Sequence, residues 1–193
     1  MLKRLFDIVV ALISLVLFSP LFLICYLLVK WDDSEGDVIY SQMRVGKGGK
    51  EFKIYKFRSM VPNAEAFNEQ LLADQQNDKR ITGAGKFLRE HHLDELPQLW
   101  NVLKGDMSFV GYRPERQFFI DQIREHDSRY DCLFQIQPGV TSYATLYNGY
   151  TDTMDKMLRR LHYDLYYLEH RNLLFDMKVL WRTFWSIARG KKF

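Results

Sequence analysis

The chain is 193 residues long, carries a formal net charge of +3 and contains 47% hydrophobic residues. This length fits one domain with an ordinary core, and so small a charge excess argues against nucleic acid as a partner. The two cysteines, Cys25 and Cys132, are too few for a disulfide framework or a zinc site.

The first predicted element is an apolar segment from Ile8 to Val29, flanked by Lys3, Arg4 and Lys30. About 20 apolar residues are enough for a helix to cross a bilayer, and no cleavage site of a secretory signal follows the segment. Since it has no polar stripe, a buried core helix fits it poorly. A spanning helix and a re-entrant helix remain open. The basic residues before it fit a solvated face or contact with anionic lipid headgroups equally well.

Ser19-Pro20 interrupts this segment near its middle. A proline inside a helix removes one hydrogen bond and clashes with the carbonyl four residues back. We therefore expect a kink, with the Ser19 hydroxyl helping to satisfy the freed carbonyls. Basic residues at both ends give no clear orientation by the positive-inside rule. A re-entrant helix with both ends in the cytoplasm resolves that ambiguity.

Beyond Trp31 the composition becomes polar, which places a boundary between a membrane segment, residues 1–30, and a globular domain, residues 31–193. Val38–Tyr40 and Phe52–Phe57 are predicted as the strands of a hairpin. The turn between them, Arg44–Lys50, is rich in glycine but lacks the glycine spacing and the Lys-Ser/Thr ending of a P-loop.

The rest of the chain is predicted to be mainly helical. We expect helices over Asn63–Asp74, from Gly83 through Arg89, over Glu115–Glu125, over Thr153–His170 and over Leu173–Ala188. Trp181 and Trp185 share one face of the last helix, where core packing and contact with a membrane surface fit equally well. The fold class is therefore α+β: an N-terminal helix-break-helix, a small domain with amphipathic interfacial helices, and a short β-hairpin.

The stretch Leu93–Asn101 carries the clearest chemical signal, the adjacent carboxylates Asp94 and Glu95. Pro97 suits the first turn of a helix, and Gly105 suits its end. We expect the pair at the start of that helix, near free N–H groups and the positive end of its dipole, where an anion or its metal can bind. A single acidic residue there is ordinarily only a helix cap. The second carboxylate and the nearby arginines favour a chemical site.

Four cations and one further acid are candidate phosphate-binding residues. The cations are Lys56, Arg58, Arg89 and Arg113. Arginine presents a planar fork that matches phosphate oxygens. Glu115 follows Arg113 by two residues, and we expect it to orient that side chain. The alternative is a set of surface ion pairs, which contribute little.

Seven short motifs follow one another along the chain. They are Lys3-Arg4-Leu5-Phe6-Asp7, Ser19-Pro20, Lys56–Met60, Leu93–Gln98, Asn101–Ser108, Arg113-Pro114-Glu115 and Gln137–Thr141. Each is modest alone, but together, on a chain of this size, they are highly specific. From about Lys3 to Asp176 the chain resembles the monotopic phosphoglycosyl transferases, the small bacterial sugar transferase family.

The resemblance implies transfer of a phosphosugar from a nucleotide diphosphosugar, here a UDP-sugar, to polyprenyl (undecaprenyl) phosphate. For this reaction Asp94 is the better nucleophile candidate, forming a covalent phosphosugar intermediate and expelling UMP. Glu95 would bind or deprotonate the acceptor phosphate, although spacing alone does not assign its role. Since two carboxylates repel substrate phosphates, we expect Mg²⁺ as cofactor, contacted by Asp94.

The resemblance also implies places for other parts of the chain. It carries over the four cations and Glu115 as site residues, and it places Gln137 and Pro138 near the nucleotide or the site entrance. It implies a re-entrant helix in the bacterial inner membrane, with the enzyme on the cytoplasmic face at the first membrane step of capsule, exopolysaccharide, O-antigen or glycoprotein glycan synthesis. A homodimer stays open.

Three places depart from the family pattern. Tyr112 stands where the family usually has the first proline of Gly-Pro-Arg-Pro-Glu. Ser142-Tyr143-Ala144 replaces a Gly-Trp-Ala or similar run, and Tyr150 replaces the arginine of a later Asn-Gly-Arg run. The main alternative function is a membrane-anchored, non-catalytic binding protein on the same fold. A glycosidase fits poorly, because its two carboxylates must lie about 5 Å or more apart across the sugar.

Overall fold

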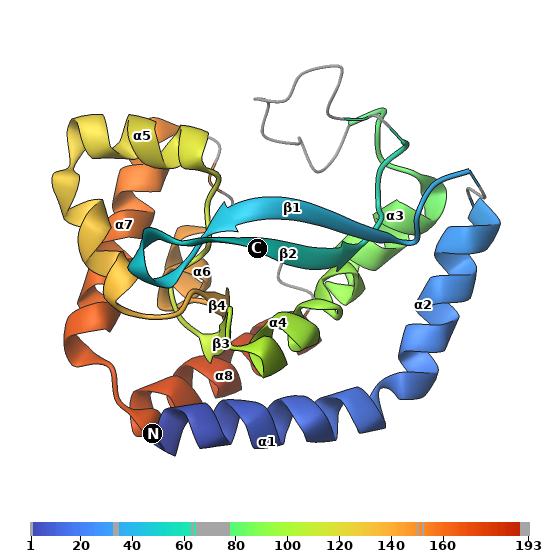
Figure 1. Ribbon diagram of the computed structural model, residues 1–193, viewed down its shortest axis with the longest axis horizontal. Coiled ribbons are helices and arrows are strands. Elements are labelled where there is room, and N and C mark those ends of the chain that lie inside the picture. Colours follow the sequence, from blue (N-terminus) through green and yellow to red (C-terminus); the bar gives the residue numbers. More distant parts are fainter. Residues whose placement is uncertain are drawn as a thin grey trace.

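The computed structural model describes residues 2–32, 35–62, 64, 78–149, 151 and 153–189. Its helices are α1 (Leu2–Leu17), α2 (Ser19–Asp32), α3 (Gly83–Glu90), α4 (Gln98–Lys104), α5 (Gln117–His126), α6 (Tyr143–Asn148), α7 (Met154–His170) and α8 (Leu173–Ala188). Its strands are β1 (Ile39–Val45), β2 (Glu51–Phe57), β3 (Ser108–Val110) and β4 (Gly139–Thr141). Figure 1 shows a mainly helical molecule with the β1–β2 hairpin across its middle. The helix predicted over Asn63–Asp74 lies, but for Ala64, outside the described residues.

The N-terminal segment is a bent pair of helices. α1 and α2 meet at an angle of 63° across the break at Phe18. The Ser19 hydroxyl donates to the carbonyl of Val16 at 2.8 Å. That carbonyl is the one that the missing N–H of Pro20 leaves free, so the predicted kink and its serine compensation are confirmed. No single described helix is long and apolar enough to cross a membrane, whereas α1 and α2 together pass that test of length and composition.

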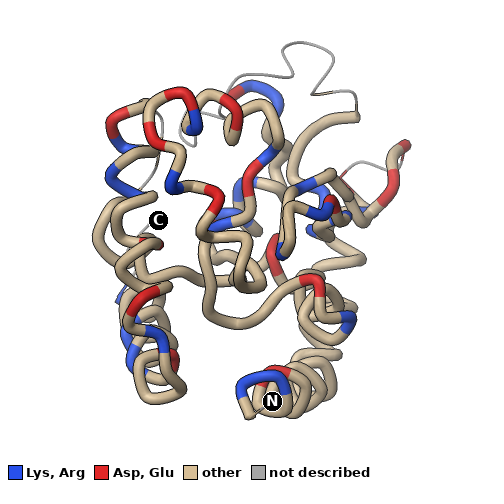
Figure 2. Tube along the Cα trace, turned by 60° about the vertical axis from the view of Figure 1, so that its left-hand side comes forward, with Lys and Arg blue, Asp and Glu red and all other residues tan. Residues whose placement is uncertain are grey.

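Charged side chains at the start of α1 bind the globular part. Arg4 donates to the carbonyls of Val102 and Leu103 in the last turn of α4, at 2.5 and 2.7 Å. The buried Asp7 carboxylate accepts from the backbone N–H of Phe109. The Lys3 ammonium forms an ion pair with Asp176. The basic residues before the apolar segment therefore bind protein groups. Beyond these turns the helix pair is nearly free of charge (Figure 2).

Both helices of the pair also supply core residues. Ala11 of α1 packs with Phe52, Ile54 and Val102, while Cys25 and Val29 of α2 join a second cluster with Val38 and Leu88. The opposite face stays apolar and exposed, for example at Leu12, Val16, Leu23 and Leu27. The pair thus packs one side on the domain and presents a second apolar side to its surroundings.

The hairpin is confirmed, with a longer first strand than predicted. β1 and β2 pair antiparallel from Ile39–Phe57 to Val45–Glu51. Gly48 and Gly49 in the turn both have φ of 70°, a backbone conformation that glycine adopts without strain. Asn101 of α4 binds strand β2 of the hairpin: its side chain accepts from the N–H of Tyr55 and donates to the carbonyl of Lys53.

A second, parallel pair of strands was not predicted. β3 and β4 are three residues each, with Ser108 paired to Gly139 and Val110 to Thr141. The motif Gln137–Thr141 therefore ends in a strand. Gly111 and Gly139 cross so closely that a Cβ on Gly139 would lie 2.1 Å from the Gly111 nitrogen. The largest core cluster lies beside this crossing, among α5, α7 and the turn Ser128–Gln135.

The three later helices match their predictions closely. α5 starts two residues after the predicted start, α7 starts one residue later, and α8 has the predicted bounds. On α8, Trp181, Phe184 and Trp185 are all exposed, so the core-packing reading of this aromatic face is wrong for the isolated chain.

Candidate active site

The carboxylate pair lies on a short turn between two helices. α3 begins after Thr82, whose hydroxyl accepts from the N–H of Gly85, and it carries Arg89 in its last turn. The chain then reverses at His92, the only described non-glycine residue with positive φ, at 55°. A single 3-10 turn, Leu93–Glu95, follows and holds Asp94 and Glu95.

The prediction that Asp94 and Glu95 lie at the start of the next helix is wrong. α4 begins at Gln98, directly after Pro97, and ends at Lys104, where Gly105 with φ of 92° follows it as the predicted stop. Two residues separate Glu95 from α4. What surrounds the carboxylates is therefore the His92 reversal and nearby side-chain charge rather than the first turn of a helix.

Lys56 and Glu95 form an ion pair that joins β2 to this turn. The Lys56 Nζ lies 2.6 Å from Glu95 Oε1, and each side chain is about one-fifth exposed. Burial raises the pKa of the Glu95 carboxyl, but the positive charges of Lys56 and Arg113 outweigh it and lower the pKa to about 2. Glu95 is therefore ionised at every physiological pH.

Asp94 has a different environment from its neighbour. It is 8% exposed, and among the described residues its carboxylate has neither a hydrogen-bond partner nor an ion-pair partner. Burial raises the pKa of the Asp94 carboxyl, and the charges of Lys56 and Arg89 oppose that rise. The two adjacent carboxylates therefore differ: the pKa of Asp94 is raised, whereas the pKa of Glu95 is lowered.

The predicted cations do not all gather at the pair. Lys56 binds Glu95 directly, and the charges of Arg89 and Arg113 lower the pKa of Asp94 and Glu95 respectively. Arg58 is buried, and its guanidinium fills the space beside Gly36, where a Cβ would lie 2.1 Å from Nη1. These contacts place the Arg58 side chain against the loop before β1.

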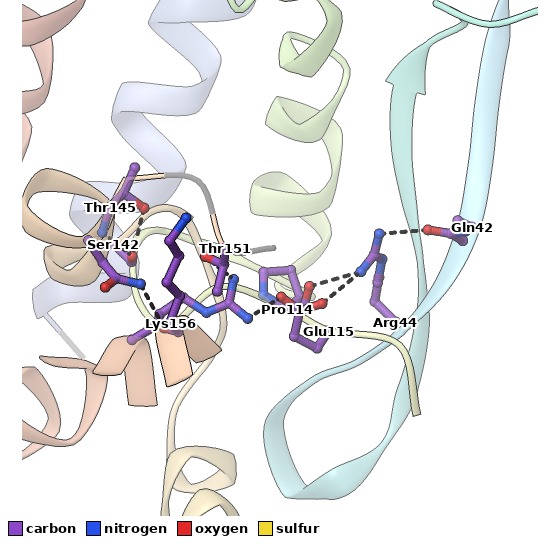
Figure 3. Close-up of polar contacts among 10 residues, drawn as sticks. Gln42, Arg44, Pro114, Glu115, Ser142, Thr145, Thr151 and Lys156 are labelled. Carbon is purple, nitrogen blue, oxygen red and sulfur yellow. Dashed lines mark hydrogen bonds and ion pairs between the residues drawn. The ribbon is translucent and has the colours of Figure 1, made fainter. Parts of the chain in front are cut away.

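The sequence predicts that Glu115 orients Arg113, but its ion-pair partners in the structure are two other arginines. Its carboxylate binds Arg160 of α7 at 2.6 Å and Arg44 of β1 at 3.3 Å. Figure 3 shows Arg44 reaching from the hairpin toward Pro114 and Glu115, with Gln42 beyond it. Burial raises the pKa of Glu115, but attraction to Arg160 and Arg44 outweighs it and lowers the pKa. Glu115 thus ties the hairpin to α7.

Sequence reasoning missed Arg44 and Arg160. Neither lies in one of the motifs, and Arg160 is 45 residues from Glu115 in the sequence. A signal was present on α7, where Arg160 and Asp164 fall on the same buried face as Met157 and Leu161. Charged residues on an apolar helix face are paired when buried, so that face predicted an ionic partner in another element.

Gln137 and Pro138 lie beside the Arg113 turn. The Pro138 carbonyl accepts from the N–H of Ser108 at 2.8 Å, and the next residue, Gly139, donates to the Tyr112 carbonyl at 2.8 Å. Pro138 is buried and Gln137 partly buried. These contacts brace the turn that carries Arg113, and they involve backbone groups.

An open cavity of about 510 Å³ lies elsewhere, between α6 and α8. It is lined by Leu146, Tyr147, Trp181, Arg182, Trp185, Ser186 and Arg189. None of the predicted site residues lines it, so the chemistry is assigned to the surroundings of Asp94 rather than to this cavity.

A metal ion would find few protein ligands here. In the described part of the chain no group of three or more His, Cys, Asp or Glu residues is arranged to hold an ion. Mg²⁺ in phosphate-binding sites uses one or two carboxylates together with substrate oxygens. Since Glu95 is tied to Lys56, Asp94 is the carboxylate of this site that fits such a partial ligand set.

Comparison with known proteins gives one family and several relatives. The family described as bacterial sugar transferase matches residues 1–190. A UDP-N-acetylgalactosamine-undecaprenyl-phosphate N-acetylgalactosaminephosphotransferase of Aeromonas hydrophila is 40% identical over 188 residues, covering 97% of this chain and 44% of the relative. A UDP-glucose:undecaprenyl-phosphate glucose-1-phosphate transferase of Klebsiella pneumoniae is 40% identical, covering 94% and 39%.

A third relative is of similar length to this chain. The exopolysaccharide production protein ExoY of Sinorhizobium fredii is 33% identical over 202 residues, covering 98% of this chain and 86% of the relative. By contrast, the chain spans only about two-fifths of the length of the first two relatives.

Proposed function

The chain belongs to the bacterial sugar transferase family, and from this premise we propose that it transfers a phosphosugar from a UDP-sugar to undecaprenyl phosphate, with release of UMP. The names of the relatives from Aeromonas and Klebsiella describe this reaction for two different sugars. The observation that carries the proposal is the environment of the two carboxylates: Glu95 is held by Lys56, and beside it Asp94 has no such partner among the described residues.

This contrast divides the roles of the pair. A carboxylate locked in an ion pair at 2.6 Å is a poor nucleophile, because attack would break that pair. A buried carboxylate outside any ion pair keeps its electron pairs available. We therefore assign the nucleophile to Asp94, and we assign to Glu95 the orientation of Lys56 and of the acceptor phosphate.

The reaction then runs as two displacements. A carboxylate oxygen of Asp94 attacks the phosphorus that bears the sugar, the bond from that phosphorus to the bridging oxygen breaks, and UMP leaves. A phosphate oxygen of undecaprenyl phosphate next attacks the same phosphorus and releases the Asp94 carboxylate. Each step forms one P–O bond and breaks one, so the product keeps one diphosphate linkage and Asp94 is regenerated.

The proposal assigns phosphate binding to three cations. Lys56 lies at the carboxylates, while Arg89 and Arg113 act on them from α3 and from the turn after β3. Fixed positive groups stabilise the charge that spreads over a phosphoryl group in transfer. Arg58 belongs to this proposal only as a support for the loop at Gly36.

The proposal also includes a bound Mg²⁺ ion. Asp94 would hold it together with oxygens of the substrate diphosphate. When bound, the ion neutralises phosphate charge and so reduces repulsion from the two carboxylates. With the purified full chain, excess EDTA should stop UMP release and added Mg²⁺ should restore it. Full activity in excess EDTA would remove the ion from the proposal.

A membrane-bound, re-entrant N-terminus fits the packing of the helix pair. The start of α1 binds α4, β3 and α8, and the end of α2 packs on Val38 and Leu88. Since both ends contact the same globular part, both ends lie on the side of the membrane that holds that part. The supply of UDP-sugars in the cytosol makes this the cytoplasmic face of the inner membrane, at an early step of capsule or exopolysaccharide synthesis.

UMP release tests the function directly. The full chain, purified in detergent, is incubated with a panel of UDP-sugars and a short polyprenyl phosphate, and UMP and the lipid product are quantified. We expect both products in equal amounts from at least one sugar. Binding of UDP-sugar without UMP release from any member would favour the alternative, a non-catalytic binding protein on this fold.

A further inference from the structure

Helix α8 presents an exposed apolar stripe along one side. Its members are Leu174, Met177, Trp181, Phe184 and Trp185, and all five side chains are exposed. They recur at intervals of three or four residues, with Trp185 one turn after Trp181, so they share one side of the helix. The buried residues of α8, Asp176 and Val179, lie on a different side. The helix therefore packs on the domain with one side and exposes the apolar stripe on another.

A row of basic residues runs beside the apolar stripe. Lys178 and Arg182 are one turn apart, and Arg189 follows seven residues later, just past the end of α8. At 3.6 residues per turn, which is about 100° per residue, this row lies directly next to the stripe. A tryptophan-rich apolar stripe flanked by arginine and lysine is typical of a helix that lies in the interfacial zone of a membrane.

The open cavity between α6 and α8, of about 510 Å³, lies on the basic side of this helix. Two of its lining residues are arginines, Arg182 and Arg189, and none is acidic. The Arg182 guanidinium donates to the Tyr147 hydroxyl across the cavity, and the Arg189 guanidinium lies 5.9 Å from the centre of the Trp185 ring. Since a guanidinium has five N–H donors, these contacts leave donors for an anion.

The start of α8 is tied to the start of the proposed membrane helices. The Lys3 ammonium of α1 lies 2.5 Å from the Asp176 carboxylate of α8. In the view of Figure 1 both helices run along the lower edge of the molecule. α1 also has exposed apolar side chains, for example Leu5 and Val16. The apolar stripe of α8 is therefore close to the bilayer that α1 is proposed to enter.

We propose that the α6–α8 cavity is a binding site for an anionic membrane phospholipid: Arg182 and Arg189 bind the phosphate of its headgroup, and its acyl chains lie along the apolar stripe. The inference rests on the membrane-bound form of the proposed function. The cavity has the size of an ordinary small-molecule site, and arginine forks match phosphate oxygens. Because no acidic residue lines the cavity, it has no partner for the cationic end of a zwitterionic headgroup.

The proposed lipid is a bound component rather than the reacting acceptor. None of the residues assigned to the reaction lines the cavity. A phospholipid held there would fix α8, and with it the domain, at a set depth in the membrane surface. This second contact would add to the anchoring by α1 and α2, since stable membrane attachment commonly uses more than one signal.

Lipid titration of the purified full chain tests the site. The chain in detergent is titrated with phosphatidylglycerol, with phosphatidylcholine of the same acyl chains and with glycerol phosphate, and native mass spectrometry gives each Kd. We expect phosphatidylglycerol to bind about 10-fold more tightly than either of the others. Equal Kd values for the two lipids would overturn the selection of an anionic headgroup. An equal Kd for glycerol phosphate would show a site for a free phosphate and overturn the lipid assignment.

Matched variants assign the binding to the cavity. Arg182→Gln should raise the Kd for phosphatidylglycerol about fivefold or more. Lys178→Gln is the control, because it removes a charge of the same basic row outside the cavity, and it should change the Kd less than about twofold. Equal losses in the two variants would show a general charge effect and overturn the site.

A second variant blocks the cavity and keeps both arginines. Ser186 lines the cavity and is partly buried, so Ser186→Trp should fill the space and also weaken phosphatidylglycerol binding. It decides the question if Arg182→Gln, which loses the bond to Tyr147, does not fold by circular dichroism. A wild-type Kd in the folded variant would overturn the proposal.

UMP release separates this site from the proposed function. With saturating UDP-sugar and acceptor, kcat of Arg182→Gln should stay within about twofold of the wild-type value. Displacement of phosphatidylglycerol by polyprenyl phosphate, with a raised KM for that acceptor in Arg182→Gln, would make the acceptor the occupant and overturn the proposal. No UMP release by the wild-type chain from any UDP-sugar would overturn the proposed function, whereas the Kd comparison would still decide the lipid site.

Discussion

The ammonium group of Lys56 lies 2.6 Å from the carboxylate of Glu95 and thereby joins strand β2 to the turn that follows His92. This bond leaves Asp94, one residue earlier, as the carboxylate without an ion-pair partner among the described residues. The distinction between a paired and an unpaired carboxylate is what separates the two roles in the proposed reaction.

Loss of the Lys56 charge should therefore affect both carboxylates. Lys56→Met leaves Glu95 without its nearest positive charge, which raises the pKa of Glu95 from its low value. We expect kcat/KM for the UDP-sugar to fall about 100-fold or more. The matched control is Lys53→Met on the same strand, where the side chain is exposed. Equal activities of the two variants would contradict the role given to Lys56.

Local patterns predicted local structure well. The kink at Ser19-Pro20, the end of α4 at Gly105 and the bounds of α8 all follow from residues close in sequence. The carboxylate pair was identified by its motif, although the short turn that holds it was not, because the His92 reversal depends on a positive φ, which is uncommon for any non-glycine residue.

Long-range contacts explain most of what sequence reasoning missed. β3 and β4 have three residues each and pair across a gap of nearly 30 residues, so neither gives a periodic signal. Similarly, the partners of Glu115 come from β1 and α7. Arg58 lies one residue past β2 with its guanidinium beside Gly36, a contact that its motif does not predict, and its role at the phosphates stays a prediction.

Arg4 should stabilise the folded chain. Its guanidinium donates to the carbonyls of Val102 and Leu103 in the last turn of α4, where carbonyls lack the i+4 partners of a helix interior. Arg4→Ala should lower the free energy of unfolding by about 1–3 kcal/mol, measured as a lower Tm by circular dichroism in detergent. Lys47→Ala, an exposed change in the hairpin turn, serves as the control. An unchanged Tm for Arg4→Ala would refute this anchor.

Asp164 should make stability depend on pH. Burial raises the pKa of this carboxyl to about 7, with Arg160 and Arg113 opposing the rise and Glu115 adding to it. The folded chain therefore holds a proton that the unfolded chain releases near pH 4, so the Asp164 contribution falls as pH rises from about 4 through about 7. Asp164→Asn cannot titrate. Its Tm relative to wild type should rise across this window, whereas a constant difference would contradict the shifted pKa.

The helix pair gives a topology prediction. Single cysteines at Leu2, which is exposed, and at Glu35, in a background without Cys25 and Cys132, can be tested in cells with an impermeant thiol reagent added from outside. Neither should react, because both ends contact the globular part. Straightening the break with Ser19→Ala and Pro20→Ala should expose the Leu2 position in part of the population, since a straight helix of about 30 residues is longer than the ~30 Å bilayer core. Labelling at Leu2 but not at Glu35 in the otherwise unmodified chain would show a spanning helix instead.

The central claim is that Asp94 carries the phosphosugar. The most direct measurement is covalent labelling of the purified full chain by a UDP-sugar that is radioactive in the phosphate next to the sugar, without acceptor lipid. We expect one labelled site, located by mass spectrometry at Asp94, and release of the label on addition of polyprenyl phosphate. Asp94→Asn should remain folded, lose the label and lose at least about 1,000-fold in kcat. Normal turnover by a folded Asp94→Asn protein, or a label on another residue, would contradict the account.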